Sequence, residues 1–297
     1  MSCFFVSDFY KQKFGTKVYK LTVDAGCTCP NRDGTKALGG CIFCNAVGSG
    51  DFIESRELPV AVQVENAKKR VEAKFGAARE KKYIVYFQNF TNTYGDPDLL
   101  FKKFCEAAEC RDVVGIAIAT RPDCVGIEIL KKIASLCNKT FVSIELGLQT
   151  TNESTAAYIR RFYSNWDYTD AVDRIHKADS RIHVVTHLIF GLPGDKRTDM
   201  MNSVKFAVAA GTDGIKISCL YILKGTAIEK DFLDGKVCIL GMDEYFSLIK
   251  QALTFIPDNI VIHRLTGDGP KKYLLAPEWT KDKKTVLNRM HKICFES

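Results

Sequence analysis

Four cysteines lie close together near the start of the sequence. Cys27 and Cys29 precede a glycine-rich segment, and Cys41 and Cys44 follow it as a CxxC pair that encloses Phe43. Glycines on both sides allow the backbone to turn tightly around a compact group. Because thiolates select zinc or iron–sulfur clusters over hard cations, this spacing predicts a soft-metal site.

The residues alone allow two kinds of metal centre. If all four cysteines are ligands, the site is a structural four-thiolate zinc centre. If only Cys29, Cys41 and Cys44 are ligands, the site holds a [4Fe–4S] cluster with one iron left open. An open iron needs a catalytic scaffold around it, so the remainder of the chain decides between the two.

The segments Cys29-Pro30-Asn31-Arg32-Asp33-Gly34 and Gly39-Gly40-Cys41-Ile42-Phe43-Cys44 resemble the radical S-adenosylmethionine (SAM) enzymes. Within them, the chain looks most like the branch related to the catalytic subunit of Elongator, and like a bacterial family of small single-domain proteins implicated in tRNA wobble-uridine modification. The resemblance implies that Cys29, Cys41 and Cys44 hold a [4Fe–4S] cluster and that Phe43 is the family's aromatic residue before the last ligand. The eleven residues between the first two ligands are themselves a mark of this branch. Cys27 lies outside the pattern, and we interpret it as a buried thiol.

The same resemblance implies contacts to SAM from strand ends. Gln88 and Asn89 lie where many family members carry two glycines that meet the SAM amino group. Gln149 matches a glutamine that contacts SAM in related enzymes, and an arginine twelve residues later does so too. That arginine is Arg161, with Arg160 beside it as a possible substitute. An arginine fork suits a carboxylate.

Three further features extend this candidate site. Glu145 is a carboxylate in an otherwise apolar strand and needs a partner, for which Arg121 is a candidate unless it contacts substrate. The turn from Gly191 to Gly194 resembles the GLPG turn that lets backbone approach the adenine of SAM. His187 lies where a related family has aspartate, although a single strand histidine is more often structural.

Hydrophobic segments with the composition of strands alternate with amphipathic helices along most of the chain. Strands are expected over residues 18–23, 83–87, 114–119, 141–146, 183–190 and 214–218. Such alternation predicts parallel βα units. The expected fold class is therefore α/β, a partial (β/α)6 TIM-like barrel, which is the radical SAM architecture. In such barrels the catalytic loops follow the C-terminal ends of the strands, as the cysteine segment follows the first strand.

The last part of the chain differs from the repeating units. We expect a helix over about 243–255, an edge strand over 259–263 and a final helix over about 284–294. We divide the chain into a radical SAM core with an N-terminal lead-in, residues 1–240, and a C-terminal extension packed on the same domain, residues 241–297. The extension should close the open edge of the barrel and place Lys271, Lys272 and the basic run 281–284 near its mouth.

Length and composition agree with one large α/β domain. The chain has 297 residues, a hydrophobic fraction of 46% and a net charge of +7. No apolar run approaches the length of a membrane span, and the first residues do not form a signal peptide. We therefore expect a cytoplasmic protein that does not associate with a membrane. The cysteines outside the cluster segment are scattered and suit free thiols in a reducing cytosol. The positive charge permits a polyanionic partner without demanding one.

The leading hypothesis is an RNA-modifying radical SAM enzyme with a [4Fe–4S] cluster and SAM as cofactors. The resemblance implies action on the tRNA wobble uridine, with removal of the carboxymethyl part of a carboxymethylaminomethyl substituent to leave aminomethyl. The partners would be tRNA and an electron donor such as flavodoxin or ferredoxin. One alternative is a zinc-stapled, non-catalytic RNA-binding module that uses Cys27 as fourth ligand. The other is a radical SAM enzyme that acts on a small molecule of the porphyrin type.

Overall fold

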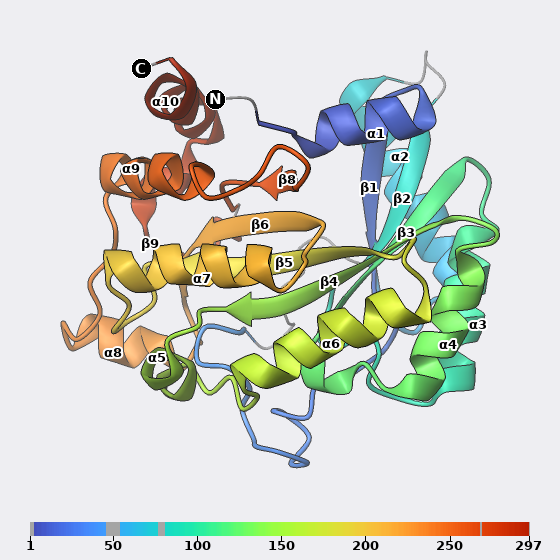
Figure 1. Ribbon diagram of the computed structural model, residues 1–297, viewed down its shortest axis with the longest axis horizontal. Helices are drawn as coiled ribbons and strands as arrows, with labels where there is room; N and C mark the ends of the chain where they lie inside the picture. The colour runs from blue at the N-terminus through green and yellow to red at the C-terminus, as the bar shows by residue number, and fades with distance from the viewer. Residues whose placement is uncertain (1–2, 46–53, 77–80, 268, 297) are drawn as a thin grey trace.

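Parallel strands curl into a half-barrel whose outer face is covered by helices (Figure 1). The computed structural model describes residues 3–45, 54–76, 81–267 and 269–296. Within these residues the sheet has seven strands, and each pairs in parallel with the next along the chain. Its strands are, in order, β1 (Val18–Val23), β2 (Lys82–Phe87), β3 (Val113–Thr120), β4 (Phe141–Gln149), β5 (His183–Phe190), β6 (Gly214–Cys219) and β8 (Val261–Arg264).

Helices follow most of these strands, as parallel pairing requires. The described helices are α1 (Val6–Phe14), α2 (Val60–Phe75), α3 (Pro97–Ala108), α4 (Ile127–Leu136), α5 (Glu153–Tyr158), α6 (Asn165–Ala178), α7 (Arg197–Ala209), α8 (Ile228–Leu233), α9 (Met242–Leu253) and α10 (Lys283–Phe295). The six strands expected from the sequence are present, and the expected edge strand is β8. The prediction of an α/β partial barrel is confirmed.

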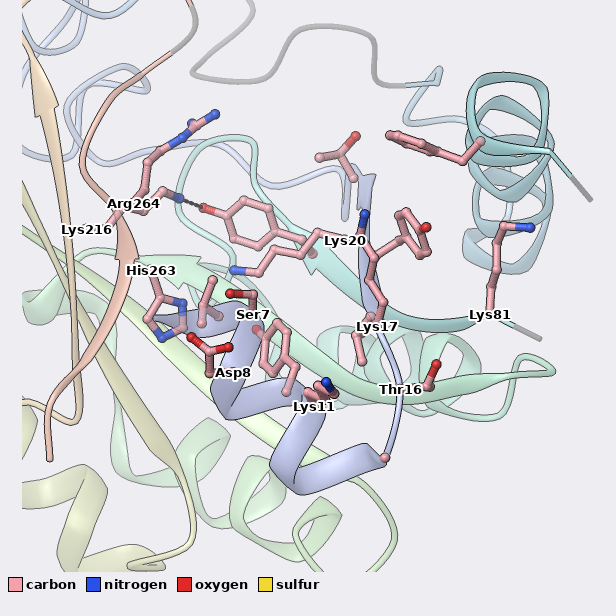
Figure 2. A pocket seen from close by; sticks show the side chains of 18 of the residues that line it. Ser7, Asp8, Lys11, Thr16, Lys17, Lys20, Lys81, Lys216, His263 and Arg264 are labelled. Carbon is pink, nitrogen blue, oxygen red and sulfur yellow. Dashed lines mark hydrogen bonds between the residues drawn. The ribbon is translucent and has the colours of Figure 1, made fainter. Parts of the chain in front are cut away.

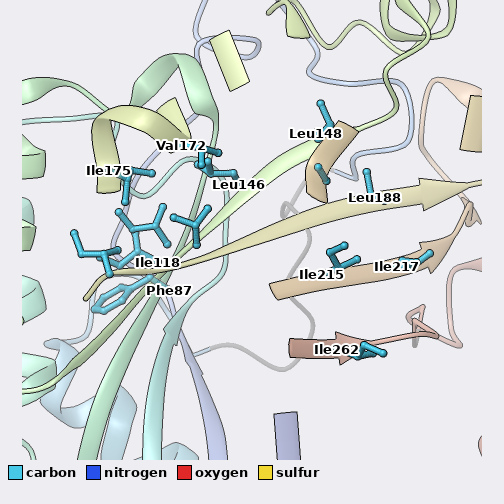
Figure 3. Packing of buried hydrophobic residues seen from close by; sticks show 14 of the residues in the cluster. Phe87, Ile118, Leu146, Leu148, Val172, Ile175, Leu188, Ile215, Ile217 and Ile262 are labelled. Atoms are coloured by element: carbon cyan, nitrogen blue, oxygen red, sulfur yellow. The ribbon is translucent and has the colours of Figure 1, made fainter. Parts of the chain in front are cut away.

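Side chains alternate between the two faces of the sheet, which separates the core from the site. Outward-facing residues such as Phe87, Ile118 and Leu146 are fully buried and pack against helices, for example against Ile175 of α6 (Figure 3). Because successive strand residues point to opposite faces, their neighbours in sequence point into the half-barrel. Several of those neighbours are polar or charged, which is typical of a site rather than of a core.

Helix α1 closes the N-terminal end of the half-barrel. It packs against β1 and β8, and the backbone of Ile262 donates to the Phe4 carbonyl at 2.8 Å. The rings of Phe9, Tyr10 and Phe14 gather around Phe141, with ring centroids about 6 Å apart. No helix was predicted from the sequence for the segment Val6–Phe14. Its aromatic side chains fill the barrel interior, so the opposite, C-terminal ends of the strands remain for chemistry.

The C-terminal part packs on the same body. Helices α9 and α10 lie against each other, and a short antiparallel pair joins β7 (Ile222–Leu223) to β9 (Leu274–Ala276). Asp282 caps α10 by accepting from the backbone of Lys284 and Thr285 at 3.1 Å. The division between residues 240 and 241 stays a prediction. Among the described residues, no helix combines the length and the apolar character needed to cross a membrane.

Candidate active site

A cavity of about 340 Å³ lies inside the half-barrel, at the C-terminal ends of the strands. Its walls come from loops and strands far apart in the sequence. Of the residues singled out from the sequence, those that line it are Cys29, Cys41, Phe43, Cys44, Gln88, Arg121, Glu145, Gln149 and His187. The fold thus brings the three predicted ligands together with most of the predicted cofactor contacts.

The cysteine loop is held in place by contacts with the segment after α5. The fully buried Asn31 donates through Nδ2 to the carbonyl of Arg160 at 2.8 Å and reaches the Cys41 Sγ at 3.6 Å. The Cys41 thiol itself donates to the same carbonyl at 3.5 Å. On the other side of the loop, Arg32 donates to the Cys44 carbonyl at 3.2 Å. These contacts fix the backbone so that the thiols face the cavity.

The thiols of the predicted ligands lie near one another. Burial, together with the neighbouring Cys44 and Cys29, raises the pKa of Cys41 to about 12. Thiols must lose their protons to bind a metal, so binding here would be coupled to proton release. Among the described residues, no three Cys, His, Asp or Glu side chains are gathered tightly enough to hold a single metal ion. Three thiols facing one cavity fit a larger iron–sulfur cluster, which Cys29, Cys41 and Cys44 would hold.

Cys27 has different surroundings from the other three cysteines. Only 5% of its surface is exposed, and it belongs to the main hydrophobic core rather than to the cavity lining. Burial raises the pKa of this thiol to about 11. The placement supports its interpretation as a buried thiol.

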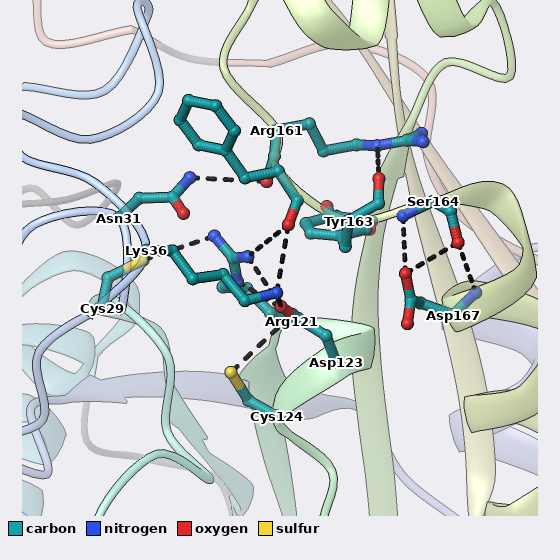
Figure 4. Close-up of polar contacts among 12 residues, drawn as sticks. Cys29, Asn31, Lys36, Arg121, Asp123, Cys124, Arg161, Tyr163, Ser164 and Asp167 are labelled. Atoms are coloured by element: carbon teal, nitrogen blue, oxygen red, sulfur yellow. Dashed lines mark hydrogen bonds and ion pairs between the residues drawn. The ribbon is translucent and has the colours of Figure 1, made fainter.

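Arg121 connects the cysteine loop to the end of β3 (Figure 4). Its guanidinium pairs with Asp123 at 2.8 and 2.9 Å, and its Nη1 lies 3.9 Å from the Cys29 Sγ. The expectation that Arg121 might be the partner of Glu145 is wrong, because its carboxylate partner is Asp123. The Tyr163 ring lies between Arg121 and Arg161, with 4.8 and 4.9 Å between each guanidinium carbon and the ring centroid. A cation beside a ligand sulfur is one means of tuning a cluster.

Gln149 is aimed into the cavity by an irregularity at the end of β4. The register between β4 and β5 shifts between Gly147 and Gln149, and Gln149 has a left-handed φ of +67°. A Cβ on Gly147 would lie only 2.5 Å from the Gln149 Nε2, so glycine makes room for this side chain. Bulges of this kind re-aim side chains at functional sites.

Arg161 and Arg160 both lie outside the cavity lining. Arg161 is 1% exposed, and its guanidinium donates to the carbonyls of Leu148, Thr150 and Tyr163 at 2.6–3.0 Å. The side chain of Arg160 is exposed, and its backbone carbonyl receives the contacts from the cysteine loop. Their direct contact with SAM stays a prediction.

The other predicted cofactor contacts differ in their distance from the cavity. Gln88 lines it, whereas Asn89 is buried and donates to the Asp24 carboxylate at 2.9 Å, which orders the chain before the cysteine loop. Gly191 and Gly194 have left-handed φ values of +83° and +91° and do not line the cavity. Leu192, between these glycines, packs in one cluster with Ile42 of the cysteine loop. The turn at residues 191–194 therefore supports the cysteine loop through this apolar contact.

Glu145 has three partners inside the half-barrel. Its oxygens lie 2.5 Å from the Lys20 ammonium, 3.1 Å from that of Lys216 and 2.6 Å from the His187 Nε2. Burial opposes ionisation, but the two lysines and the histidine outweigh it and hold the pKa of Glu145 well below its usual range. Burial also lowers the pKa of His187 to about 4, so the ring is neutral and donates to the carboxylate.

The two lysines were not predicted from the sequence. Lys20 and Lys216 are each the single charged residue of their strand, which is the signal that identified Glu145. Burial lowers the pKa of Lys216 to about 8, and its ammonium also donates to the Tyr86 hydroxyl at 3.2 Å. These charges form a compact polar cluster deep in the half-barrel.

Comparisons with known proteins agree with this geometry. The model of the Radical SAM superfamily matches residues 29–207, and that of the Radical_SAM C-terminal domain matches residues 212–294. The chain is 41% identical over 282 residues to Bacillus subtilis YtqA, which covers 95% of this chain and 86% of that protein. It is 24% identical over 178 residues to the tRNA uridine(34) acetyltransferase of Dehalococcoides mccartyi, which covers 59% of this chain and 38% of the other.

A solved structure shares the fold at low identity. The archaeal Methanocaldococcus infernus Elp3, lacking N-terminal residues 1–46, superimposes with a TM-score of 0.66 and 17% identity. The match covers 93% of this chain, but this chain spans only 63% of the length of that protein. Since the superfamily model covers more than half of the sequence, the chain belongs to the radical SAM superfamily, whose members are enzymes that bind a [4Fe–4S] cluster and SAM.

Proposed function

We propose that this radical SAM enzyme modifies the wobble uridine of tRNA and converts a carboxymethylaminomethyl substituent into aminomethyl. Loss of one hydrogen atom and one further electron from the carboxymethyl carbon, with that electron returning to the cluster, followed by addition of water, would release that group as glyoxylate. The observation that carries the proposal is the likeness, over more than half of the chain, to an enzyme named for uridine 34 of tRNA. A net charge of +7 is compatible with a polyanionic substrate. The chain spans only part of that relative. The substituent on which this protein acts is therefore proposed separately from the activity of that relative.

The cavity suits a base that has left its stack. Enzymes that act on a base extrude it into a pocket, where aromatic side chains stack on it. Phe43 and Tyr221 line the cavity together with the three cysteines. When bound, the cluster and SAM supply one chemistry, the removal of a hydrogen atom from the substrate by a SAM-derived radical. The protein residues would hold the base and shield it from bulk water. An electron donor such as flavodoxin or ferredoxin would dock on the protein and supply the electron.

The zinc-stapled RNA-binding module receives less support. It requires Cys27 as a fourth ligand, and that residue packs in the hydrophobic core away from the cavity. It also leaves the charged cluster around Glu145 without a role.

The test is a reaction of the reconstituted enzyme with SAM, dithionite and tRNA that bears carboxymethylaminomethyl-uridine. Mass spectrometry of the nucleosides should show aminomethyl-uridine appearing together with 5′-deoxyadenosine. The Cys41→Ala variant, which lacks one proposed ligand, should form neither product. If 5′-deoxyadenosine forms while the modified nucleoside stays unchanged, the wobble-uridine assignment is wrong and the radical SAM chemistry alone stands.

A further inference from the structure

A second cavity, of about 1060 Å³, opens on the side of the half-barrel beside α1, β1 and β8 (Figure 2). Its described lining is strongly basic and includes a single carboxylate, that of Asp8. The basic residues in this lining are Lys11, Lys17, Lys20, Lys81, Lys216 and Arg264. An excess of cations around a large cavity predicts an anionic ligand.

The side cavity and the active-site cavity meet at a shared wall. Tyr86, Gln88, Lys216 and Arg264 line both of them. Lys216 extends from β6 into the half-barrel, and Arg264 ends β8 at the open edge of the sheet (Figure 2). A ligand held in the side cavity at this wall therefore also borders the space in front of the cysteines.

Positive charge is in excess among the described groups at the shared wall. The ammonium groups of Lys20 and Lys216 share one fully buried carboxylate, that of Glu145. Arg264 is close enough for its charge to disfavour the protonated forms of both lysines. Two partly buried ammonium groups that share one carboxylate are stabilised by a further anion. The arrangement would be stabilised by a ligand with one negative group.

This basic wall is distinct from the surroundings of the thiols. The groups that shift the pKa of Cys41 are the other two cluster cysteines, Arg121 and Asn31. The groups that shift the pKa of Lys216 are Glu145, Lys20 and Arg264. Arg121 lies at the Cys29 sulfur and Lys216 lies at Glu145, so the cavity has a thiol end and a basic wall that come from different parts of the chain.

We propose that Lys216 and Arg264 form a subsite for the carboxylate of the substrate's substituent, at the wall between the two cavities. This inference rests on the proposed function, in which the substituent carries a carboxymethyl group. Glu145 acts as a positioning residue, because its ion pair holds the Lys216 ammonium at the wall. The aminomethyl product has no carboxylate and loses this contact, which favours its release.

The experiment compares two anticodon stem–loop RNAs that differ only in the wobble substituent, carboxymethylaminomethyl or aminomethyl. Their dissociation constants are measured with the cluster-loaded protein and SAM but without reductant, so that no turnover occurs. The wild type should bind the carboxylate-bearing RNA about tenfold more tightly, as expected for a charge-assisted hydrogen bond. Lys216→Met and Arg264→Gln should each reduce this ratio several-fold towards one.

Lys17→Met provides the matched control, because Lys17 lines the side cavity but lies over the rings of Tyr19 and Phe75. It should keep the ratio even if affinity for both RNAs changes. Arg264 is exposed, so its variant tests the subsite even if Lys216→Met fails to fold. A wild-type ratio of one, or an unchanged ratio in the folded Lys216 or Arg264 variant, overturns the subsite. Turnover of the modified tRNA is scored separately, so failure of the proposed function remains distinguishable from failure of the subsite.

Discussion

At the scale of single residues, the surroundings of each cysteine distinguish a ligand from a core thiol. Cys41 is hydrogen-bonded to the segment after α5 and faces the cavity, whereas Cys27 packs among core side chains. Both thiols have raised pKa values because both are buried, so titration behaviour alone does not separate them. What separates them is that two further thiols lie beside Cys41, whereas Cys27 lies among the apolar side chains of the core.

The first prediction concerns the cluster ligands. Replacing Cys29, Cys41 or Cys44 by alanine should remove most of the iron bound after anaerobic reconstitution, because a cluster held by two thiolates is labile. Cys27→Ala is the matched control and should keep its iron and its visible absorption, at a modest cost in stability. Full iron content in Cys41→Ala together with loss in Cys27→Ala would reverse the assignment.

The second prediction concerns pH and the proposed carboxylate subsite. The pKa of Lys216 is lowered to about 8, chiefly by burial, and a bound carboxylate would raise it. The carboxylate-dependent ratio of dissociation constants should therefore be constant below about pH 7 and fall from about ten towards one above pH 8. Binding titrations of the two RNAs between these values measure it, and Lys216→Arg should remove the decline.

The other groups at the wall would not mimic this pH dependence. The charged and titratable groups that face Lys216 are Lys20 on β1, Tyr86 on β2, Glu145 on β4, His187 on β5, and His263 and Arg264 on β8. The pKa of Lys20 is raised and that of Tyr86 is raised well above its usual value. The pKa of Glu145 is held well below its usual range, that of His187 is about 4, and that of His263 is well below its usual value. A ratio that stays constant up to pH 9.5 would exclude Lys216 as the titrating group.

At the scale of elements, the segment after β4 is shaped by a buried guanidinium. Gln149, Arg160 and Phe162 all have left-handed φ values, between +56° and +67°, which are uncommon for residues other than glycine. The Arg161 guanidinium donates to backbone carbonyls on both sides of this turn. The turn also provides the Arg160 carbonyl, which accepts a hydrogen bond from Asn31 of the cysteine loop. The arginine thus acts on the cluster loop through the backbone.

The third prediction follows from this role. Arg161→Met should destabilise the protein by about 3 kcal/mol, because three carbonyls lose their donor and Glu153 loses an ion pair of 3.5 Å. Urea unfolding of the apoprotein measures it. Arg160→Met, on an exposed side chain, should change stability by less than about 0.5 kcal/mol. An Arg161→Met protein of wild-type stability that has lost SAM affinity would instead support the direct contact expected from the sequence.

How far the sequence predicts this structure depends on the kind of element. The bounds of β1 and β5 are predicted to the residue, because alternation marks β1 and a hydrophobic run that stops at Gly191 marks β5. Helix α1 is missed because its aromatic face packs into the barrel interior, a surface that exists only once the sheet has curled. In the site, the cysteines are found from spacing. The ion pairs of Glu145 are not, because they depend on which strands face each other across the barrel.

At the scale of the whole molecule, the half-barrel leaves two faces for a large substrate. The active-site cavity opens beside the loop that contains Gly269 and Pro270, and the side cavity opens between β1 and β8. Lys271 and Lys272 follow this loop directly and are exposed. Lys283 and Lys284, in contrast, begin α10, and no residue of that helix lines either cavity. The mouth is therefore basic on the side that the C-terminal segment contributes.

The last prediction tests this face with tRNA. Phosphate contacts release counterions, so the affinity should fall steeply with salt, with a logarithmic slope of about −0.7 to −0.9 per phosphate neutralised. Charge reversal by Lys271→Glu with Lys272→Glu should weaken binding. It should also make this slope shallower by the amount that corresponds to about two phosphate contacts. Cluster content and SAM binding should not change, because neither lysine lines the cavity. Filter binding across a salt series measures both quantities.

The matched control applies the same change of charge on the outer face. Lys131→Glu with Lys132→Glu alters α4, which packs on the outside of the half-barrel, where Lys132 pairs with Asp98 at 2.6 Å. If tRNA reaches the cavity past the loop at residues 269–272, the control lowers affinity only through net charge and leaves the slope near its wild-type value. Equal losses of affinity and equal slopes in both double variants would mean that net charge alone attracts the RNA, and the docking face would then have to lie elsewhere.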